Sequence, residues 1–178
     1  PIPAHILGNM WGDNWLNIFE QVNPPNQNRN YDLTQLLRRN RIDQMEMVRY
    51  GDRFFRSLGF EPLPPSFWER SLFIKPADRD VVCGASAWNL DYESDIRIKM
   101  CINITGGDFV KIHQVVSHNY YQRSYSGKDP LYRAGANDGF HEGVGDAIEL
   151  SITPKYLARI GLLNRSLSSE DDVALLLH

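Results

Sequence analysis

The sequence lacks long hydrophobic runs, clustered positive charge and a large number of cysteines. No apolar run approaches the roughly 20 residues that span a bilayer, and no basic start precedes a short apolar segment as in a signal peptide. The net charge is −3, and 19 basic and 22 acidic residues are interspersed along the chain. Because phosphate binding needs clustered lysine and arginine, nucleic acid is excluded as an expected partner. We expect membrane attachment only through an anchor outside these residues.

The two ends of the chain are unlike the ends of a complete domain. A single domain of 178 residues would be ordinary in length. However, the chain begins at Pro1 without an initiator methionine, and residues 174–178 stop inside an apolar run without a terminating glycine or proline. We therefore expect residues 1–178 to be the central fragment of one larger domain, incomplete at both ends.

The two cysteines, Cys83 and Cys101, lie in or beside segments with strand character. Residues 81–88 form the first segment. In the second, polar residues alternate with apolar ones, as in a half-buried strand: Ile96, Ile98, Met100, Ile102 and Ile104. The polar residues 91–95 between them predict a turn. The cysteines would then lie on or near neighbouring strands, which is compatible with a disulfide in an oxidising compartment and also with a reduced pair.

Helical signals fill most of the remaining chain. Residues 9–20 predict an aromatic helix, and a loop rich in proline and asparagine follows at 21–30. A short helix is predicted at 33–39, capped by Asp32, and a brief one around 67–70. Asp43 should cap a longer helix that Gly59 ends. Its predicted core face consists of Met45, Val48, Phe55 and Leu58.

Two further helices are predicted in the region 108–150. The first runs from residue 109 to about 125, with Asp108 as its N-cap and Gly127 at its end. The second surrounds Phe140-His141-Glu142 and must stop before Pro154. Its glycines lower helix propensity by about 1 kcal/mol each. Close packing against the first helix is the expected reason for them.

The first of these helices resembles a damaged zinc-binding helix. In a His-Glu-x-x-His motif the two histidines are four apart and point off one face at one ion, while the glutamate activates water. Here His113 and His118 are five apart, which at about 100° per residue places them near opposite sides. Four residues before His118 stands Gln114, a neutral amide, and the next position holds Val115, which cannot exchange a proton.

The second helix carries two carboxylates in the expected arrangement for such a site. Glu142 and Asp146 are four apart on one helical face, as for a third metal ligand and the carboxylate behind it. The sequence therefore keeps some residues of a metal site, whereas Gln114 and Val115 stand where a ligand histidine and a catalytic glutamate are expected.

Several segments together resemble the angiotensin-converting enzyme family of peptidyl-dipeptidases. They occur in that family's order at residues 2–11, 67–68, 81–88, 97–101 and 135–142. The resemblance implies a mainly α, gluzincin-type helical peptidase fold with a short β-hairpin at the cleft, of which this chain would be part.

The resemblance also assigns roles. His118 matches the second zinc histidine, Glu142 the third zinc ligand and Asp146 the carboxylate behind it, whereas Gln114 replaces the first zinc histidine and Val115 the catalytic glutamate. His113 matches a histidine that the family does not use for zinc. In the substrate-binding strand, Gly84 replaces a histidine, while the backbones of Ala85 and Ala87 could still bind an extended peptide. Asp13 replaces a glutamine that helps to hold the substrate's C-terminal carboxylate.

The resemblance implies a disulfide between Cys83 and Cys101 and an extracellular location, either secreted or as a membrane-anchored ectodomain. The sequons at Asn103 and Asn164 would suit N-glycans there. Among family members, the chain most resembles the nematode-type kind that lacks the zinc motif.

We therefore expect a pseudoenzyme without a cofactor, which binds an unidentified peptide or protein. The alternative is an active zinc peptidyl-dipeptidase in which a helical bulge brings His113, His118 and Glu142 together, with His141 as the candidate base. A third option is weak residual metal binding by His118 and Glu142 without catalysis.

Overall fold

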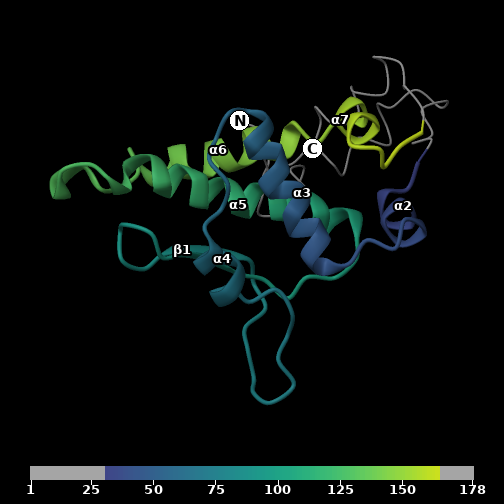
Figure 1. The fold of residues 1–178 in the computed structure, drawn as a ribbon, viewed down its shortest axis with the longest axis horizontal. Coiled ribbons are helices and arrows are strands. Elements are labelled where there is room, and N and C mark those ends of the chain that lie inside the picture. Colours follow the sequence, from purple (N-terminus) through teal and green to yellow (C-terminus); the bar gives the residue numbers. More distant parts are fainter. Residues whose placement is uncertain (1–30, 165–178) are drawn as a thin grey trace, which may run out of the picture. The chain divides into compact units, whose positions relative to one another are not determined.

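The structure is a computed structural model that describes residues 31–164. Within it, Leu33–Ile152 form one compact unit, and Thr153 begins a stretch that belongs to a second unit. The predicted helix at 9–20 and Asp13 lie outside the described residues. The first unit contains, in chain order, α2 (Leu33–Arg39), α3 (Gln44–Ser57), α4 (Pro65–Arg70), β1 (Ser86–Asn89), β2 (Ile96–Lys99), α5 (Gly106–Ser126), the short 3₁₀ helix η2 (Pro130–Tyr132) and α6 (Asp138–Leu150). This confirms the predicted mainly helical fold with one β-hairpin (Figure 1).

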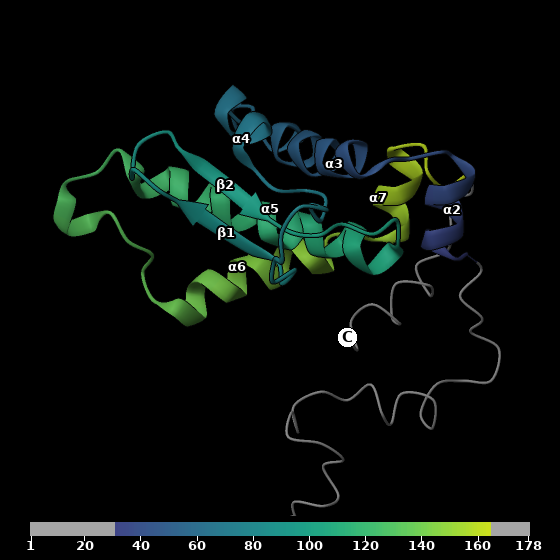
Figure 2. The same cartoon turned by 90° about the horizontal axis from the view of Figure 1, so that it is seen from below.

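Helix α5 is the central element of this unit. It lies between the β1–β2 hairpin and α6, and α3 packs against it as well (Figures 1 and 2). Its buried residues surround much of its circumference: Phe109, Ile112, His113, Gln114, Val115, Val116, Ser117, Asn119 and Tyr120. Because several of these buried residues are polar, no single apolar face dominates the sequence of the helix.

Helix α5 begins three residues earlier than predicted. The N-cap is Thr105, whose hydroxyl oxygen accepts a hydrogen bond from the Asp108 N–H at 3.1 Å, so the prediction of Asp108 as the N-cap is wrong. The Asp108 carboxylate instead accepts from the Asn103 N–H at 2.6 Å. These two bonds resemble a capping box, in which residues at both ends of the first turn satisfy free N–H groups. The end of α5 at Gly127 is as predicted.

Helix α3 has the predicted ends and part of the predicted buried face. The Asp43 carboxylate accepts from the Glu46 N–H at 2.7 Å, and Gly59 follows the helix with φ +94°. Leu58, predicted to be core, is 57% exposed. Val48 and Phe55 are buried as predicted, Met45 is only partly buried, and Met47, Asp52 and Phe54 are buried as well. Asp52 belongs to this face because its carboxylate accepts hydrogen bonds from the Tyr120 hydroxyl and the Leu63 N–H.

The hairpin has the predicted turn and a shorter second strand. One carboxylate oxygen of Asp91 accepts hydrogen bonds from the backbone N–H groups of residues 93, 94 and 95, which fixes the turn. The strand ends at Lys99, although burial alternates to residue 102 as predicted. Beyond Lys99 the backbone pairs with another segment: the Met100 N–H donates to the Leu72 carbonyl and the Ile102 N–H to the Phe73 carbonyl.

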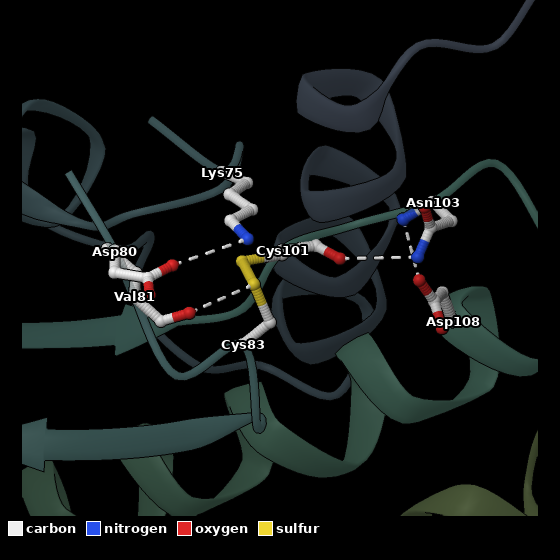
Figure 3. The surroundings of a disulfide bond; sticks show 7 residues. All are labelled: Lys75, Asp80, Val81, Cys83, Cys101, Asn103 and Asp108. Atoms are coloured by element: carbon white, nitrogen blue, oxygen red, sulfur yellow. Dashed lines mark hydrogen bonds and ion pairs between the residues drawn. A yellow bond between two sulfur atoms is a disulfide. The ribbon is translucent and has the colours of Figure 1, made fainter. Parts of the chain in front are cut away.

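A disulfide joins the segments that flank the hairpin. Cys83 and Cys101 are bonded, with their Cα atoms 5.0 Å apart, which confirms the predicted bridge. Figure 3 shows the disulfide close to the start of α5, where Asn103 and Asp108 meet. The bridge therefore ties the segment before β1 to the segment that leads from β2 into α5.

The described part of the second unit contains one helix, α7 (Pro154–Arg159). The Thr153 hydroxyl oxygen accepts from the Tyr156 N–H, and Pro154 occupies the first turn, where its missing N–H is not needed. Helix α6 ends before Pro154, as predicted. Among residues 31–164, no helix combines the length and apolar character needed to cross a bilayer.

Candidate functional site

One open cavity of about 380 Å³ lies against β1, α5 and α6. The residues lining it come from the β1 segment (Ala85, Ser86, Ala87), from α5 (Lys111, Gln114, Val115, His118, Gln122) and from α6 (His141, Glu142). The structure thus brings together the strand alanines and the residues that the sequence assigned to the altered metal site. Asp146 does not line the cavity, but its carboxylate accepts a hydrogen bond from the lining residue Gln114.

His113 lies on a different side of α5 and takes no part in the cavity wall. Its side chain is fully buried, its Nδ1–H donates to the Phe109 carbonyl at 2.8 Å, and its ring meets Phe54 edge to face. Burial lowers the pKa of His113 to about 4, so the imidazole is neutral near pH 7. Helix α5 is a regular α-helix from Gly106 to Ser126. A bulge that would bring His113 beside His118 is not present in it.

His118 is half-buried in the cavity wall and pairs with His141. The two Nδ1 atoms are 2.8 Å apart, so the N–H of one ring donates a hydrogen bond to the Nδ1 of the other. Burial, followed by the neighbouring His141, lowers the pKa of His118, while Glu142 and Asp146 oppose that shift. The pair links α5 to α6.

Gln114 forms a second link between the same helices. Its Nε2 donates to Oδ1 of Asp146 at 3.0 Å, and its side chain is only 5% exposed. Gly145 permits this approach, since a Cβ there would lie 2.9 Å from Gln114 Cγ and 3.1 Å from His118 Cε1. The predicted close packing of the glycines is therefore confirmed at Gly145. At Gly143, by contrast, nothing lies within 4 Å of such a Cβ.

The donor set at this wall does not fit a catalytic zinc ion, which takes three protein ligands and a water. Of the positions that the sequence assigned to zinc ligands, His118 and Glu142 keep a donor atom, and the nearby His141 ring is paired with His118. The Gln114 amide is bonded to Asp146, and Val115, 2% exposed, has no donor atom. Over residues 31–164, no group of three or more His, Cys, Asp or Glu side chains is placed to hold a metal ion.

The outer edge of β1 has backbone groups that β2 does not use. The Leu90 N–H donates to the Asp95 carbonyl, and Trp88 is opposite Arg97 in the same register. Because hydrogen-bonded and non-hydrogen-bonded pairs alternate in an antiparallel ladder, the N–H and C=O of Ala87 face away from β2. Ala85 lies two residues earlier, directly before β1. Gly84, just before it, is exposed with open space around its Cα.

Sequence reasoning missed three residues of the cavity wall, namely Ser86, Lys111 and Gln122. Lys111 and Gln122 lie on the same face of α5 as Val115 and His118, so the helical spacing 111, 115, 118, 122 could have identified them. The pairing of His141 with His118 carried no signal in the sequence, because it depends on how α6 approaches α5. Asn103 and Asn164, the two sequon asparagines, are both exposed.

Comparison with known proteins places this arrangement in a family. The model of the peptidase M2 family, described as angiotensin-converting enzyme, matches residues 1–178. The chain is 42% identical to bovine angiotensin-converting enzyme over 180 residues, 99% of this chain and 14% of the relative. It is 40% identical to angiotensin-converting enzyme of Haematobia irritans exigua over 173 residues, 96% of this chain and 28% of the relative.

A third relative is the angiotensin-converting enzyme-related protein of Drosophila melanogaster, 40% identical over 163 residues, which cover 91% of this chain and 26% of that protein. The chain thus spans between about one seventh and somewhat over a quarter of the length of these relatives. With a family model that covers every residue and relatives at this level of identity, the chain belongs to the peptidase M2, or angiotensin-converting enzyme, family.

Proposed function

We propose that this chain is part of a non-hydrolytic member of the family, a pseudoenzyme that retains the peptidase scaffold and binds a peptide or protein segment. The observation that carries the proposal is the Gln114–Asp146 hydrogen bond. At the position that the family resemblance gives to the first zinc histidine, a neutral amide is bonded to the carboxylate behind the site. A zinc ion at this site would lack the first of its three protein ligands.

The position of the general base supports the same proposal. Val115 is 2% exposed and has no group that could take a proton from water. Loss of a general base alone reduces rates by about 10² to 10⁴. His118 and Glu142 would remain as two residual ligands, too few to hold zinc tightly. These departures reinforce one another, because each removes a different requirement of the same reaction.

The binding part of the proposal rests on the free edge of β1 beside the cavity. An extended peptide can add to an exposed strand through main-chain hydrogen bonds, with side-chain pockets giving specificity. Ala87, whose N–H and C=O face away from β2, and Ala85 would supply these bonds. Their small side chains leave the cavity open to the peptide.

An extracellular location, secreted or as a membrane-anchored ectodomain, belongs to the proposal. The disulfide between Cys83 and Cys101 supports it, since such bonds persist in oxidising compartments. Asn103 and Asn164 are exposed and would carry N-glycans. We infer that the closest functional kind is the nematode-type member that lacks the zinc motif.

The test is hydrolysis of a reporter peptide that releases a C-terminal dipeptide, by the full-length protein with zinc supplied. We expect no turnover above buffer. The double variant Gln114→His with Val115→Glu should bind zinc and gain turnover, whereas Gln114→His alone should gain zinc binding only and Val115→Glu alone neither. Chelator-sensitive turnover by the unmodified protein would instead support the alternative, an active peptidyl-dipeptidase with an atypical site.

A further inference from the structure

The sequon that begins at Asn103 is exposed at its asparagine but fixed along its backbone. The residues on either side of it are held by groups distant in the sequence. The Ile102 N–H donates to the Phe73 carbonyl at 3.0 Å. The Gly106 N–H donates to the Thr34 hydroxyl oxygen at 2.9 Å. Both contacts join distant segments of the chain, so they exist only after this part of the protein has folded.

The sequon is also bonded to the first turn of α5. The Asn103 N–H donates to the Asp108 carboxylate at 2.6 Å (Figure 3), and the Thr105 N–H donates back to the Asn103 carbonyl at 2.9 Å. The Thr105 hydroxyl oxygen accepts from the Asp108 N–H as the N-cap of the helix. The hydroxyl group that completes the sequon is therefore already used by α5.

The disulfide restrains the same segment from the other side. Cys101 precedes Asn103 by two residues and is bonded to Cys83. The side-chain NH₂ group of Asn103 donates to the Cys101 carbonyl at 3.4 Å (Figure 3). Glycan transfer requires the asparagine and the hydroxyl residue of a sequon to enter the transferase together as a free loop. A closed bridge and a formed helix cap prevent this.

We propose that Asn103 accepts its N-glycan only before the Cys83–Cys101 bridge has closed and Thr105 has capped α5. The inference rests on the extracellular location in the proposed function and specifies how one of its glycans is controlled. In the transfer, Nδ2 of Asn103 loses a proton and bonds to C1 of the first sugar of a lipid-linked oligosaccharide. The bond from C1 to the lipid diphosphate breaks, and the lipid diphosphate leaves. Because the Asn103 side chain is exposed, the glycan is compatible with the final fold.

The experiment measures the occupied fraction of both sequons in the full-length protein, expressed in cultured animal cells. Peptide N-glycosidase in heavy-oxygen water converts each glycosylated asparagine of the total cell lysate to a labelled aspartate, which mass spectrometry counts. We expect incomplete occupancy of Asn103 in the unmodified protein. Occupancy should become nearly complete in Cys83→Ser, which leaves the sequence around the sequon intact, and in cells treated with dithiothreitol. Asn164, outside the unit Leu33–Ile152, should keep its occupancy.

The matched variants are Asp108→Ala and Asp138→Ala. Each removes an acidic side chain from the first turn of a helix, and Asp108 is the one bonded to the sequon backbone. Asp108→Ala should raise the occupancy of Asn103, and Asp138→Ala should leave it unchanged. Complete occupancy in the unmodified protein, no rise in Cys83→Ser, or equal occupancy in the two aspartate variants overturns the inference. Absence of glycan from both sequons also overturns the extracellular location, whereas peptide hydrolysis tests the pseudoenzyme proposal separately.

Discussion

A pair of glycine substitutions on α6 tests how closely this helix packs on the cavity wall. A Cβ at position 145 would lie 2.9 Å from Gln114 Cγ and 3.1 Å from His118 Cε1, whereas one at position 143 would meet nothing within 4 Å. Gln114 cannot turn aside without losing its bond to Asp146. Gly145→Ala therefore requires α6 to move away from α5.

The expected energies follow from two opposing effects. Alanine gains about 1 kcal/mol of helix propensity over glycine at both positions. Overpacking at position 145 costs about 1 to 3 kcal/mol. We expect Gly143→Ala to be more stable than the unmodified protein, and Gly145→Ala to be about 1 to 3 kcal/mol less stable than Gly143→Ala. The assay is urea unfolding followed by far-UV circular dichroism. Equal free energies of unfolding for the two variants would refute the packing described here.

Two further predictions concern stability. His113 is fully buried with a pKa lowered from 6.5 to about 4, so the unfolded chain binds its proton more readily. The free energy of unfolding should therefore be highest above pH 6.5, where His113 is neutral in both the folded and the unfolded chain. It should fall by roughly 3 kcal/mol in total as the pH is lowered towards 4. Urea midpoints measured across this range should show a steeper decline for the unmodified protein than for His113→Gln, and parallel curves would contradict this. The disulfide spans a sequence separation of 18 residues, and closing a loop of that size stabilises a fold by about 3 kcal/mol. The Cys83→Ser, Cys101→Ser double variant should therefore unfold at a lower urea concentration than the oxidised protein, and an unchanged midpoint would argue against that contribution.

Local sequence signals predicted most of the fold, because they act over a few residues. Asp43 and Gly59 mark the ends of α3, and the polar turn after β1 places the hairpin. Because these signals act over only a few residues, they also led to the wrong N-cap for α5. Thr105 and Asp108 are both good caps three residues apart, and the sequence does not decide which of them begins the helix.

Features that depend on contacts between elements were less predictable. Leu58 follows the apolar period of α3 but lies past the part of the helix that neighbours cover. Asp52 is buried on that helix because two groups distant in sequence, the Tyr120 hydroxyl and the Leu63 N–H, bond to it. Periodicity describes one helix, whereas burial depends on its neighbours.

The candidate site was predictable as a set of residues but not as a set of bonds. The family resemblance brought Gln114, His118, Glu142 and Asp146 together, and the structure places them along the α5–α6 contact. The pairing of His118 with His141 requires the helices to approach each other at Gly145. Two hydrogen bonds thus connect the helices where active family members, by the resemblance, would use a zinc ion.

Zinc stoichiometry tests the central proposal most directly. The full-length protein, loaded with excess zinc and dialysed against metal-free buffer, would be analysed by atomic emission for zinc per polypeptide chain. Because Gln114 is bonded to Asp146 and no three donor side chains of residues 31–164 are placed to hold a metal ion together, we predict far less than one zinc ion per chain. One firmly held zinc ion per chain, lost on substitution of His118 by alanine, would contradict the proposal.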